Sequence, residues 1–113
     1  MIKEAQKGVR TIVERFIYNE PPLKSKWAMN YSTDVSGRQY LFTHYQHVLL
    51  VVNPRTKLIT YQWWEKPTDL RGLQSAVLVL KEKKKIKEEY QWDNTIKQFV
   101  LTPNNVTPQT ELN

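Results

Sequence analysis

Cysteine is missing from this chain and glycine is scarce, and each shortage excludes a class of site. Without cysteine the protein forms no disulfide bond and no zinc–thiolate centre. The three glycines stand far apart, at positions 8, 37 and 72, so the sequence has no glycine-rich loop of the kind that cradles phosphates. The sequence also contains no nucleophile-elbow motif, which would indicate catalysis by a Ser/His/Asp triad.

Long hydrophobic runs are absent as well. The longest aliphatic runs, Val48 to Val52 and Ala76 to Leu80, fall far short of the roughly 20 residues that cross a bilayer. The first 20 residues mix basic and acidic side chains and contain no apolar stretch, which fits neither a secretory signal peptide nor a transit peptide. We therefore expect a cytoplasmic protein that has no membrane partner.

A moderate excess of positive charge is what the composition does contain. The 113 residues include 17 Lys+Arg and 11 Asp+Glu, so the formal net charge is 17 − 11 = +6 and the sequence pI is about 9.6. With 40% hydrophobic residues the chain is long enough to bury one modest core. We expect a single domain over residues 1–102 and a flexible polar tail over residues 103–113. Lysine outnumbers arginine, a bias typical of AT-rich bacteria and their phages.

Two segments carry the apolar spacing of an amphipathic helix. The first helix is expected over residues 2–17, and Pro21 and Pro22 end it because proline lacks the backbone donor. After Pro67, Thr68-Asp69 is a helix-start signal, and leucine and valine then recur at helical spacing, which predicts a second helix over residues 68–81. Residues 76–80 also fit a strand, so periodicity alone leaves that alternative open.

Between the two helices the composition favours strands. Residues 26–64 are rich in β-branched and aromatic side chains and contain two turn signals, Asp34 to Gly37 and Asn53 to Thr56. We expect an antiparallel meander with strands near residues 26–33, 38–45, 47–53 and 57–64. The joint at residues 45–47 lacks glycine and proline, so the second and third strands could instead be one bent strand. Val48 to Val52 is apolar on both faces, which predicts a middle strand covered on each side.

After the second helix the pattern favours a closing hairpin. Ile86, Tyr90 and Trp92 alternate as in a strand, which turns at Asp93-Asn94 into residues 96–101, although residues 81–90 could also extend the helix. The predicted fold class is therefore α+β. It consists of an N-terminal helix packed on a four-stranded antiparallel meander, followed by a second helix and a short C-terminal hairpin or helix extension.

Positive charge is concentrated in the meander. Residues 21–60 hold five basic side chains against Asp34, a local balance of 5 − 1 = +4. In an up-and-down meander the first and third turns lie at the same end of the sheet, which predicts a cluster there of Arg38, Arg55 and Lys57. The two other basic residues, Lys24 and Lys26, precede the first strand. We predict that all five contact a nucleic acid or another acidic partner.

The meander also holds eight of the 13 aromatic residues, the total being four Trp, six Tyr and three Phe. Rings beside cationic loops are typical of proteins that bind single-stranded nucleic acid, because bases stack on rings and phosphates attract Lys and Arg. Each ring taken singly is more often a core or cross-strand residue. Trp63 and Trp64 are adjacent in a predicted strand and therefore point to opposite faces, which predicts one buried and one exposed indole. The exposed one is a candidate residue for stacking on a base or docking on a partner.

Three further patterns in the sequence could form sites. His44 and His47 stand three apart, which in a strand puts them on opposite faces, so we expect no metal. The lysine-rich run Lys81 to Lys87 is interspersed with glutamate and fits a solvated face better than a phosphate site. Asp69, Glu82 and Lys84 loosely resemble the carboxylates and lysine of magnesium-dependent nucleases, but a helix over residues 68–81 would hold Asp69 and Glu82 about 20 Å apart.

The leading hypothesis is non-catalytic nucleic-acid binding through the basic, aromatic meander, without a cofactor. The main alternative is a protein-docking module, such as an inhibitor or adaptor of a larger nucleic-acid-processing protein, because aromatic residues and arginine also mark protein interfaces. The magnesium-dependent nuclease is the third alternative. Neither the choice among DNA, RNA and protein partners nor the oligomeric state follows from the sequence.

Overall fold

The computed structural model describes residues 1–35 and 37–102, which form two helices and six strands. The predicted α+β fold class is confirmed, and the elements follow one another in the predicted order. The helices are α1 (Lys7–Ile17) and α2 (Pro67–Glu82). The strands are β1 (Trp27–Asp34), β2 (Gly37–His44), β3 (His47–Asn53), β4 (Leu58–Gln62), β5 (Tyr90–Asp93) and β6 (Gln98–Leu101). The tail predicted over residues 103–113 lies outside the described residues.

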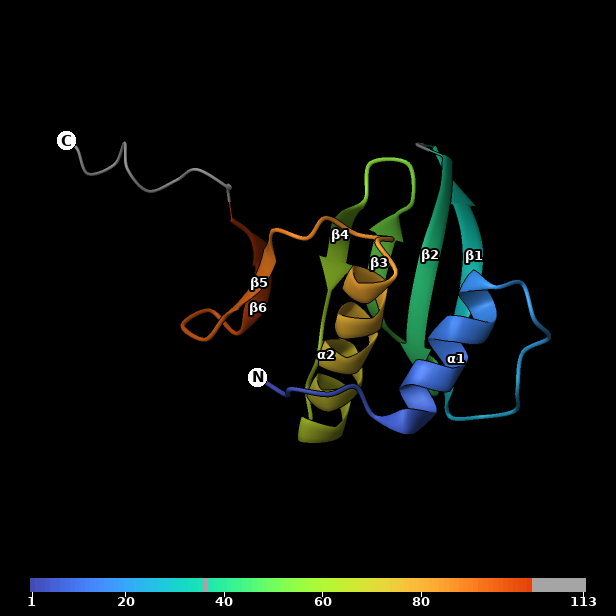
Figure 1. Cartoon of the computed structure of the whole chain (residues 1–113), viewed down its shortest axis with the longest axis horizontal. Helices are drawn as coiled ribbons and strands as arrows, with labels where there is room; N and C mark the ends of the chain where they lie inside the picture. The colour runs from blue at the N-terminus through green and yellow to red at the C-terminus, as the bar shows by residue number, and fades with distance from the viewer. Residues whose placement is uncertain (36, 103–113) are drawn as a thin grey trace.

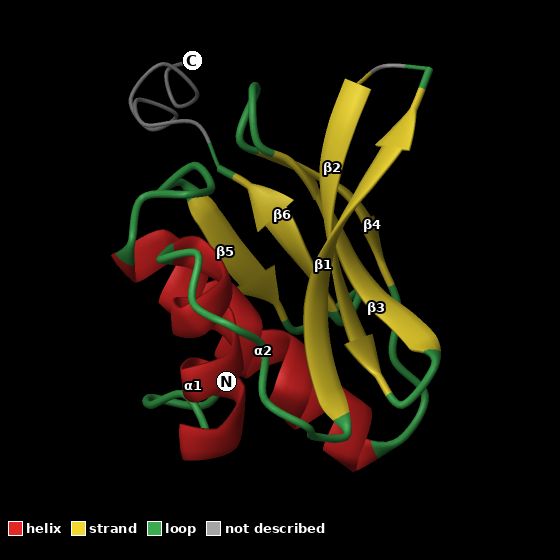
Figure 2. Ribbon diagram, turned by 90° about the vertical axis from the view of Figure 1, so that its right-hand side faces the viewer, coloured by secondary structure: helices red, strands yellow, loops and turns green. Residues whose placement is uncertain are grey.

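The elements form two layers. Strands β1 to β4 make one antiparallel sheet in chain order, whereas β5 and β6 make a separate antiparallel hairpin. Both helices lie on one face of the sheet, and the hairpin stands beside α2 (Figure 1, Figure 2). Because the strands alternate in direction, the first and third turns of the sheet lie at one end and the second turn lies at the other, as predicted.

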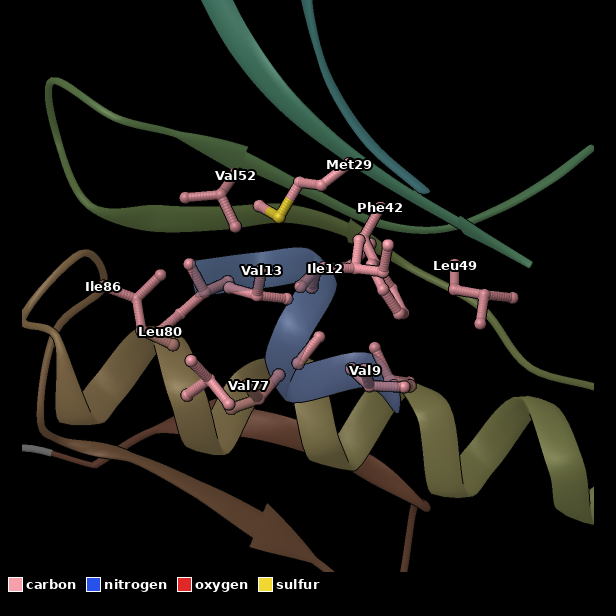
Figure 3. Packing of buried hydrophobic residues seen from close by; sticks show 14 of the residues in the cluster. Val9, Ile12, Val13, Met29, Phe42, Leu49, Val52, Val77, Leu80 and Ile86 are labelled. Carbon is pink, nitrogen blue, oxygen red and sulfur yellow. The ribbon is translucent and has the colours of Figure 1, made fainter. Parts of the chain in front are cut away.

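The hydrophobic core lies between the helices and the sheet face that they cover (Figure 3). The apolar stripe of each helix is buried there, as its spacing predicts, and so are alternate residues of the inner strands. Each large aliphatic side chain moved out of water contributes about 1.5–3 kcal/mol, so these stripes position both helices. The core includes Val9, Ile12, Val13, Met29, Phe42, Leu50, Val52, Leu73, Val77 and Leu80.

Trp27 fixes the approach of α2 to the sheet. Its indole is 4% exposed and lies against the backbone of Gly72 in α2. A Cβ atom at position 72 would overlap the six-membered ring of Trp27, so glycine is required there for a steric reason. The indole also stacks on His44, with ring centroids 4.1 Å apart.

The β5–β6 hairpin is attached to β4 by polar contacts. The side-chain amide of Gln62 donates to the Phe99 carbonyl (2.9 Å) and accepts from the Phe99 N–H (2.8 Å), as a strand neighbour would. The Tyr90 hydroxyl accepts a hydrogen bond of 2.7 Å from the Ile59 N–H. Phe99, Tyr90 and Ile86 are buried in the core, so the hairpin extends the core and covers the edge of β4.

Three element boundaries differ from the predictions. The first helix begins at Lys7 and not at residue 2, because Gln6 has extended dihedral angles and its N–H donates to the Ser75 hydroxyl of α2. The fourth strand ends at Gln62, so Trp63 and Trp64 lie beyond it. Strand β6 begins at Gln98 rather than residue 96, because the Asp93 carboxylate accepts the backbone N–H groups of the preceding turn. The uncertain joint at residues 45–47 is a tight turn.

The second face of the sheet, here called the outer face, is covered by no element of residues 1–35 and 37–102 (Figure 2). One cross-strand row on it consists of Asn30, Leu41, Val51 and Tyr61. The prediction that Val48 to Val52 forms a middle strand is confirmed, and Leu49 to Val52 are buried, although Val51 lies on the outer face and is not part of the core cluster. A register shift after Phe42 accompanies the burial of the consecutive β3 residues Leu49 and Leu50.

Candidate functional site

The third turn of the sheet presents two basic side chains. The Asn53 side-chain oxygen accepts hydrogen bonds from the N–H groups of Arg55 (2.9 Å) and Thr56 (3.1 Å). Lys57 has a left-handed backbone conformation with a φ of 63°, and its N–H donates to the Asn53 carbonyl at 2.7 Å. Asparagine in this role is the turn chemistry that the sequence indicated. The turn leaves the side chains of both Arg55 and Lys57 exposed.

Arg38 is the second residue of β2, just after the first turn. Its guanidinium lies over the Tyr31 ring, 4.6 Å from the centroid, while its side chain remains exposed. The Tyr31 and Tyr40 rings both pack on Phe16 of α1. Burial and the neighbouring Tyr31 raise the pKa of the Tyr40 hydroxyl, while the Arg38 charge opposes them. Arg38 is thus held on an aromatic support at the same end of the sheet as the third turn.

A third basic segment joins this end, although its sequence pattern favours a solvated face over a phosphate site. After α2 the chain bends at Lys84, which has a φ of 60°, and buries Ile86 in the core. The Lys87 N–H then donates to the Lys57 carbonyl at 3.1 Å, which fixes the lysine-rich segment against the third turn. Lys87 is exposed and Lys85 is half-buried. The only sequence signal for this placement is an isolated isoleucine within a charged run.

The ion pairs decide which of these cations are neutralised within the described part of the chain. Lys84 pairs with Glu88 at 3.0 Å, and Lys83 pairs with Glu14 at 3.5 Å. No ion pair among residues 1–35 and 37–102 involves the five other cations at this end. We call these five residues the basic end: Arg38, Arg55, Lys57, Lys85 and Lys87.

Lys24 and Lys26 do not join the basic end. The Lys26 carbonyl accepts a hydrogen bond of 2.6 Å from Tyr45 in the second turn, which lies at the other end of the sheet. Both lysines line a shallow hollow there together with Tyr45 and His47. The five predicted basic residues therefore form two groups. Three lie at the basic end, whereas Lys24 and Lys26 lie at the other end, because β1 runs along the length of the sheet between its two ends.

Trp63 and Trp64 do not show the contrast predicted for them. Both indoles are half-buried, since both residues lie beyond the end of β4, where strand alternation no longer applies. Their surroundings nevertheless differ. The Trp63 ring lies near His47, with ring centroids 5.8 Å apart. The Trp64 indole N–H donates to the Lys97 carbonyl at 3.1 Å, and Trp64 therefore helps to hold the hairpin.

The aromatic residues of the sheet mostly face the helices. Trp27 and Phe42 are buried in the core, and Tyr31 and Tyr40 contact α1. Within the described strands, the outer face carries Tyr61 as its aromatic side chain. Alternation explains the difference, since every second residue of β1 and β2 points inward. A broad stacking platform for bases is therefore not formed by this sheet face.

His44 has a partner that sequence spacing did not reveal. Its Nδ1 lies 2.7 Å from a carboxylate oxygen of Asp69, and because a carboxylate only accepts, Nδ1 carries the proton. The second Asp69 oxygen accepts from the N–H groups of Lys66 (3.0 Å) and Glu65 (3.3 Å) at the start of α2. Burial would raise the pKa of Asp69, but these hydrogen bonds outweigh it and lower the pKa.

The pattern that resembles a nuclease does not converge. Asp69 and Glu82 stand at opposite ends of α2, about 20 Å apart at 1.5 Å per residue. Arg10 of α1 donates to both Glu82 oxygens, at 2.9 and 3.0 Å, and this lowers the pKa of Glu82. The described residues contain no group of three or more His, Cys, Asp or Glu side chains with the geometry to hold a metal ion.

Comparisons with protein-family models, with curated proteins and with solved structures found no match to this chain. Within the part of the chain that the structure describes, neither helix has the length and apolar character needed to cross a membrane.

Proposed function

We propose that the protein binds nucleic acid and that the basic end contacts the phosphate backbone. The observation that carries this proposal is the hydrogen bond between Lys87 and Lys57, which brings a third basic segment to the two turns. Three separate segments of a chain with net charge +6 thereby present cations at one end of the molecule. Cations that form no ion pair within the described part of the chain are available to neutralise phosphates and to release their counterions.

The exposed cations of the basic end favour contacts with the phosphate backbone of a nucleic acid over recognition of its bases. The outer face of the sheet carries few rings, and its central row of Asn30, Leu41, Val51 and Tyr61 is uncharged. A phosphate-binding surface needs cations on exposed, adjustable side chains, which the turns provide, whereas base readout needs edges or rings that reach into the nucleic acid. Binding through the basic end is therefore expected to be weakly dependent on sequence and strongly dependent on salt.

The experiment compares two triple variants that carry the same net charge. The site variant is R55E/K57E/K87E, and the control is K24E/K26E/K97E, in which three exposed lysines outside the basic end are reversed. Binding of fluorescein-labelled single-stranded and duplex DNA is measured by anisotropy at several salt concentrations near 0.1 M. For duplex DNA, the site variant should bind at least about 100-fold more weakly and lose about three units of salt slope, since each phosphate contact contributes about 0.9.

The control variant should lose less affinity than the site variant and should keep most of the salt slope. Equal losses in the two variants would mean that net charge alone attracts DNA, and the basic end would then not be a site. Absence of DNA binding by the wild-type protein at about 50 mM salt would contradict the proposed function itself.

A further inference from the structure

Among residues 1–35 and 37–102, strand β1 is an edge of the sheet with one side unpaired (Figure 2). Its pairing with β2 runs from Trp27 opposite His44 to Asp34 opposite Gly37. The Lys26 carbonyl accepts the Tyr45 N–H in the same register, so the even-numbered residues of β1 exchange hydrogen bonds with β2. The odd-numbered residues therefore direct their backbone N–H and C=O groups away from the sheet.

These outward backbone groups are available along most of the strand. The Trp27 N–H donates to the Ser25 hydroxyl at 3.1 Å, whereas the N–H groups of Met29, Tyr31 and Thr33 have no such acceptor among the described residues. Strand β1 contains no proline, no lysine and no bulge, which are the usual protections of an exposed edge. The opposite edge, β4, is covered by the hairpin. An unprotected edge is a template for one more strand.

A hollow of about 430 Å³ runs beside β1 on the helix side of the sheet. Its lining is mainly apolar and includes Ile12, Phe16, Leu23 and Met29. The loop that forms its outer wall is fixed by Arg15, whose Nε donates to the Pro21 carbonyl at 2.7 Å. Since Leu23 is half-exposed in this wall, an added strand could bury it together with its own apolar side chains.

Charges at the two ends of the edge indicate the chemistry of the added strand. Lys24 and Lys26 lie exposed just before β1, and Arg38 lies over Tyr31 near its other end. The acidic residues nearby already have partners, since Glu20 pairs with Arg15 at 3.7 Å and Asp34 accepts from Gln39 at 2.6 Å. An incoming segment with acidic residues at its ends would therefore meet complementary charge.

From these features we propose that β1 binds an extended segment of a partner protein as a fifth strand. The segment pairs its backbone with the outward groups of Met29, Tyr31 and Thr33, as in other cases of β-strand addition. Its alternate side chains are apolar and enter the hollow, and acidic side chains flank them. This surface is separate from the basic end except for Arg38, which borders both.

The probe is the labelled peptide acetyl-EVTLTVE-amide, which has this pattern, and its control is acetyl-EVVLTTE-amide, which has the same composition without the alternation. Binding to the full-length protein is measured by fluorescence anisotropy up to about 1 mM peptide. The alternating peptide should bind at least about tenfold more tightly than the control. Equal binding of the two peptides, or binding of neither, would overturn the proposal.

Two protein variants locate the peptide. T33P removes one outward N–H that β2 does not use, and L23D places a charge on the wall of the hollow, so each should weaken binding about tenfold. Y61D is the matched control, because Tyr61 is 47% exposed against 48% for Leu23 but lies on the outer face, and it should change binding less than about twofold. Unchanged binding in L23D would overturn the proposal even if T33P fails to fold.

Two further measurements distinguish this proposal from dimerisation through β1 and from peptide binding at the basic end. If sedimentation shows that the wild-type protein dimerises and that T33P is monomeric, a second copy of the chain occupies the edge and the partner-segment proposal is wrong. The variant R55E/K57E/K87E should keep peptide binding, because none of its three residues borders the β1 edge. Loss of peptide binding in that variant would place the acidic peptide at the basic end and overturn the proposal.

Discussion

The two ends of the four-stranded sheet differ in whether their charged side chains are exposed or buried. At the basic end, Arg55, Lys57 and Lys87 are exposed and have no ion pair within the described residues. At the other end, here called the histidine end, His44 and Asp69 are both more than nine-tenths buried and lie 2.7 Å apart. Water stabilises the charges at the basic end, whereas hydrogen bonds must do so at the histidine end.

This difference separates stability from binding in the molecule. A buried polar group that loses its partner costs about 1–3 kcal/mol, so the histidine end contributes to folding through specific contacts. Exposed cations contribute little to folding, and for that reason they remain available to an external anion. Substitutions at the histidine end should therefore change stability, and those at the basic end should change binding.

The largest effect on stability is expected from Asp69→Ala. The substitution removes an acceptor for two N–H groups at the start of α2 and leaves the buried His44 Nδ1–H without a partner, at a total cost of about 3 kcal/mol. Asp93→Ala is the control, because Asp93 also accepts two backbone N–H groups but has no buried histidine partner, and it should cost about 1 kcal/mol. Urea denaturation measures both. Equal losses would show that the His44 contact contributes nothing.

A smaller loss is expected from Gly72→Ala, through packing rather than charge. The new methyl group would overlap the Trp27 ring, and overpacking of this kind costs about 2 kcal/mol. Gly8→Ala provides an internal comparison, because a Cβ at position 8 would meet Trp27 at an ordinary 4.0 Å. Alanine is the better helix former, so that variant should gain about 0.5 kcal/mol. A stable Gly72→Ala protein would show that α2 can move away from the sheet.

Acid should remove the stabilisation that the Asp69 carboxylate contributes at the histidine end. The pKa of Asp69 is lower in the folded protein than the ordinary aspartate value of about 3.9. The carboxylate therefore contributes its full stabilisation above that value, and this stabilisation is lost as the pH falls through the lower folded pKa. The difference in unfolding free energy between wild type and Asp69→Asn should be constant above about pH 5 and should shrink below about pH 4. A difference that stays constant down to pH 2 or so would contradict the lowered pKa.

The smallest change in stability is expected at the basic end. The triple variant R55E/K57E/K87E replaces exposed side chains that have no ion pair among the described residues, so its melting temperature should stay within about 3 °C of wild type. Circular dichroism melts measure the shift. A much larger decrease would mean that these side chains support the fold, and the loss of DNA binding in this variant would then have a structural cause.

Much of the fold could be predicted because its signals are local. Pro21 and Pro22 end α1, the spacing of leucine and valine marks α2, and Asn53 forms the third turn through contacts two and three residues away. The clustering of the first and third turns followed from the antiparallel meander itself. Boundaries were less accurate, since α1 starts at Lys7 and β4 stops at Gln62 because of contacts with distant segments.

The missed features have weaker signals. Gly72 lies within an otherwise good helix-forming segment, where glycine lowers helix stability by about 1 kcal/mol relative to alanine. A glycine at such a position indicates close packing. The sequence does not name Trp27 as the residue that packs there. Similarly, Ile86 within a charged run indicates an anchored segment, but nothing local indicates that Lys87 reaches Lys57.

The sequence by itself determined most of the secondary structure, the order of the elements and the positive charge of the turns, because helix and strand periodicity and turn chemistry act over a few residues. Only the tertiary structure decided that His44 meets Asp69, 25 residues away, and that the lysine segment after α2 lies against the third turn. It also decided that most of the sheet aromatics turn inward and that β1 is an unpaired edge among the described residues. These outcomes depend on how the layers pack, and packing is set by shape and burial across the whole chain.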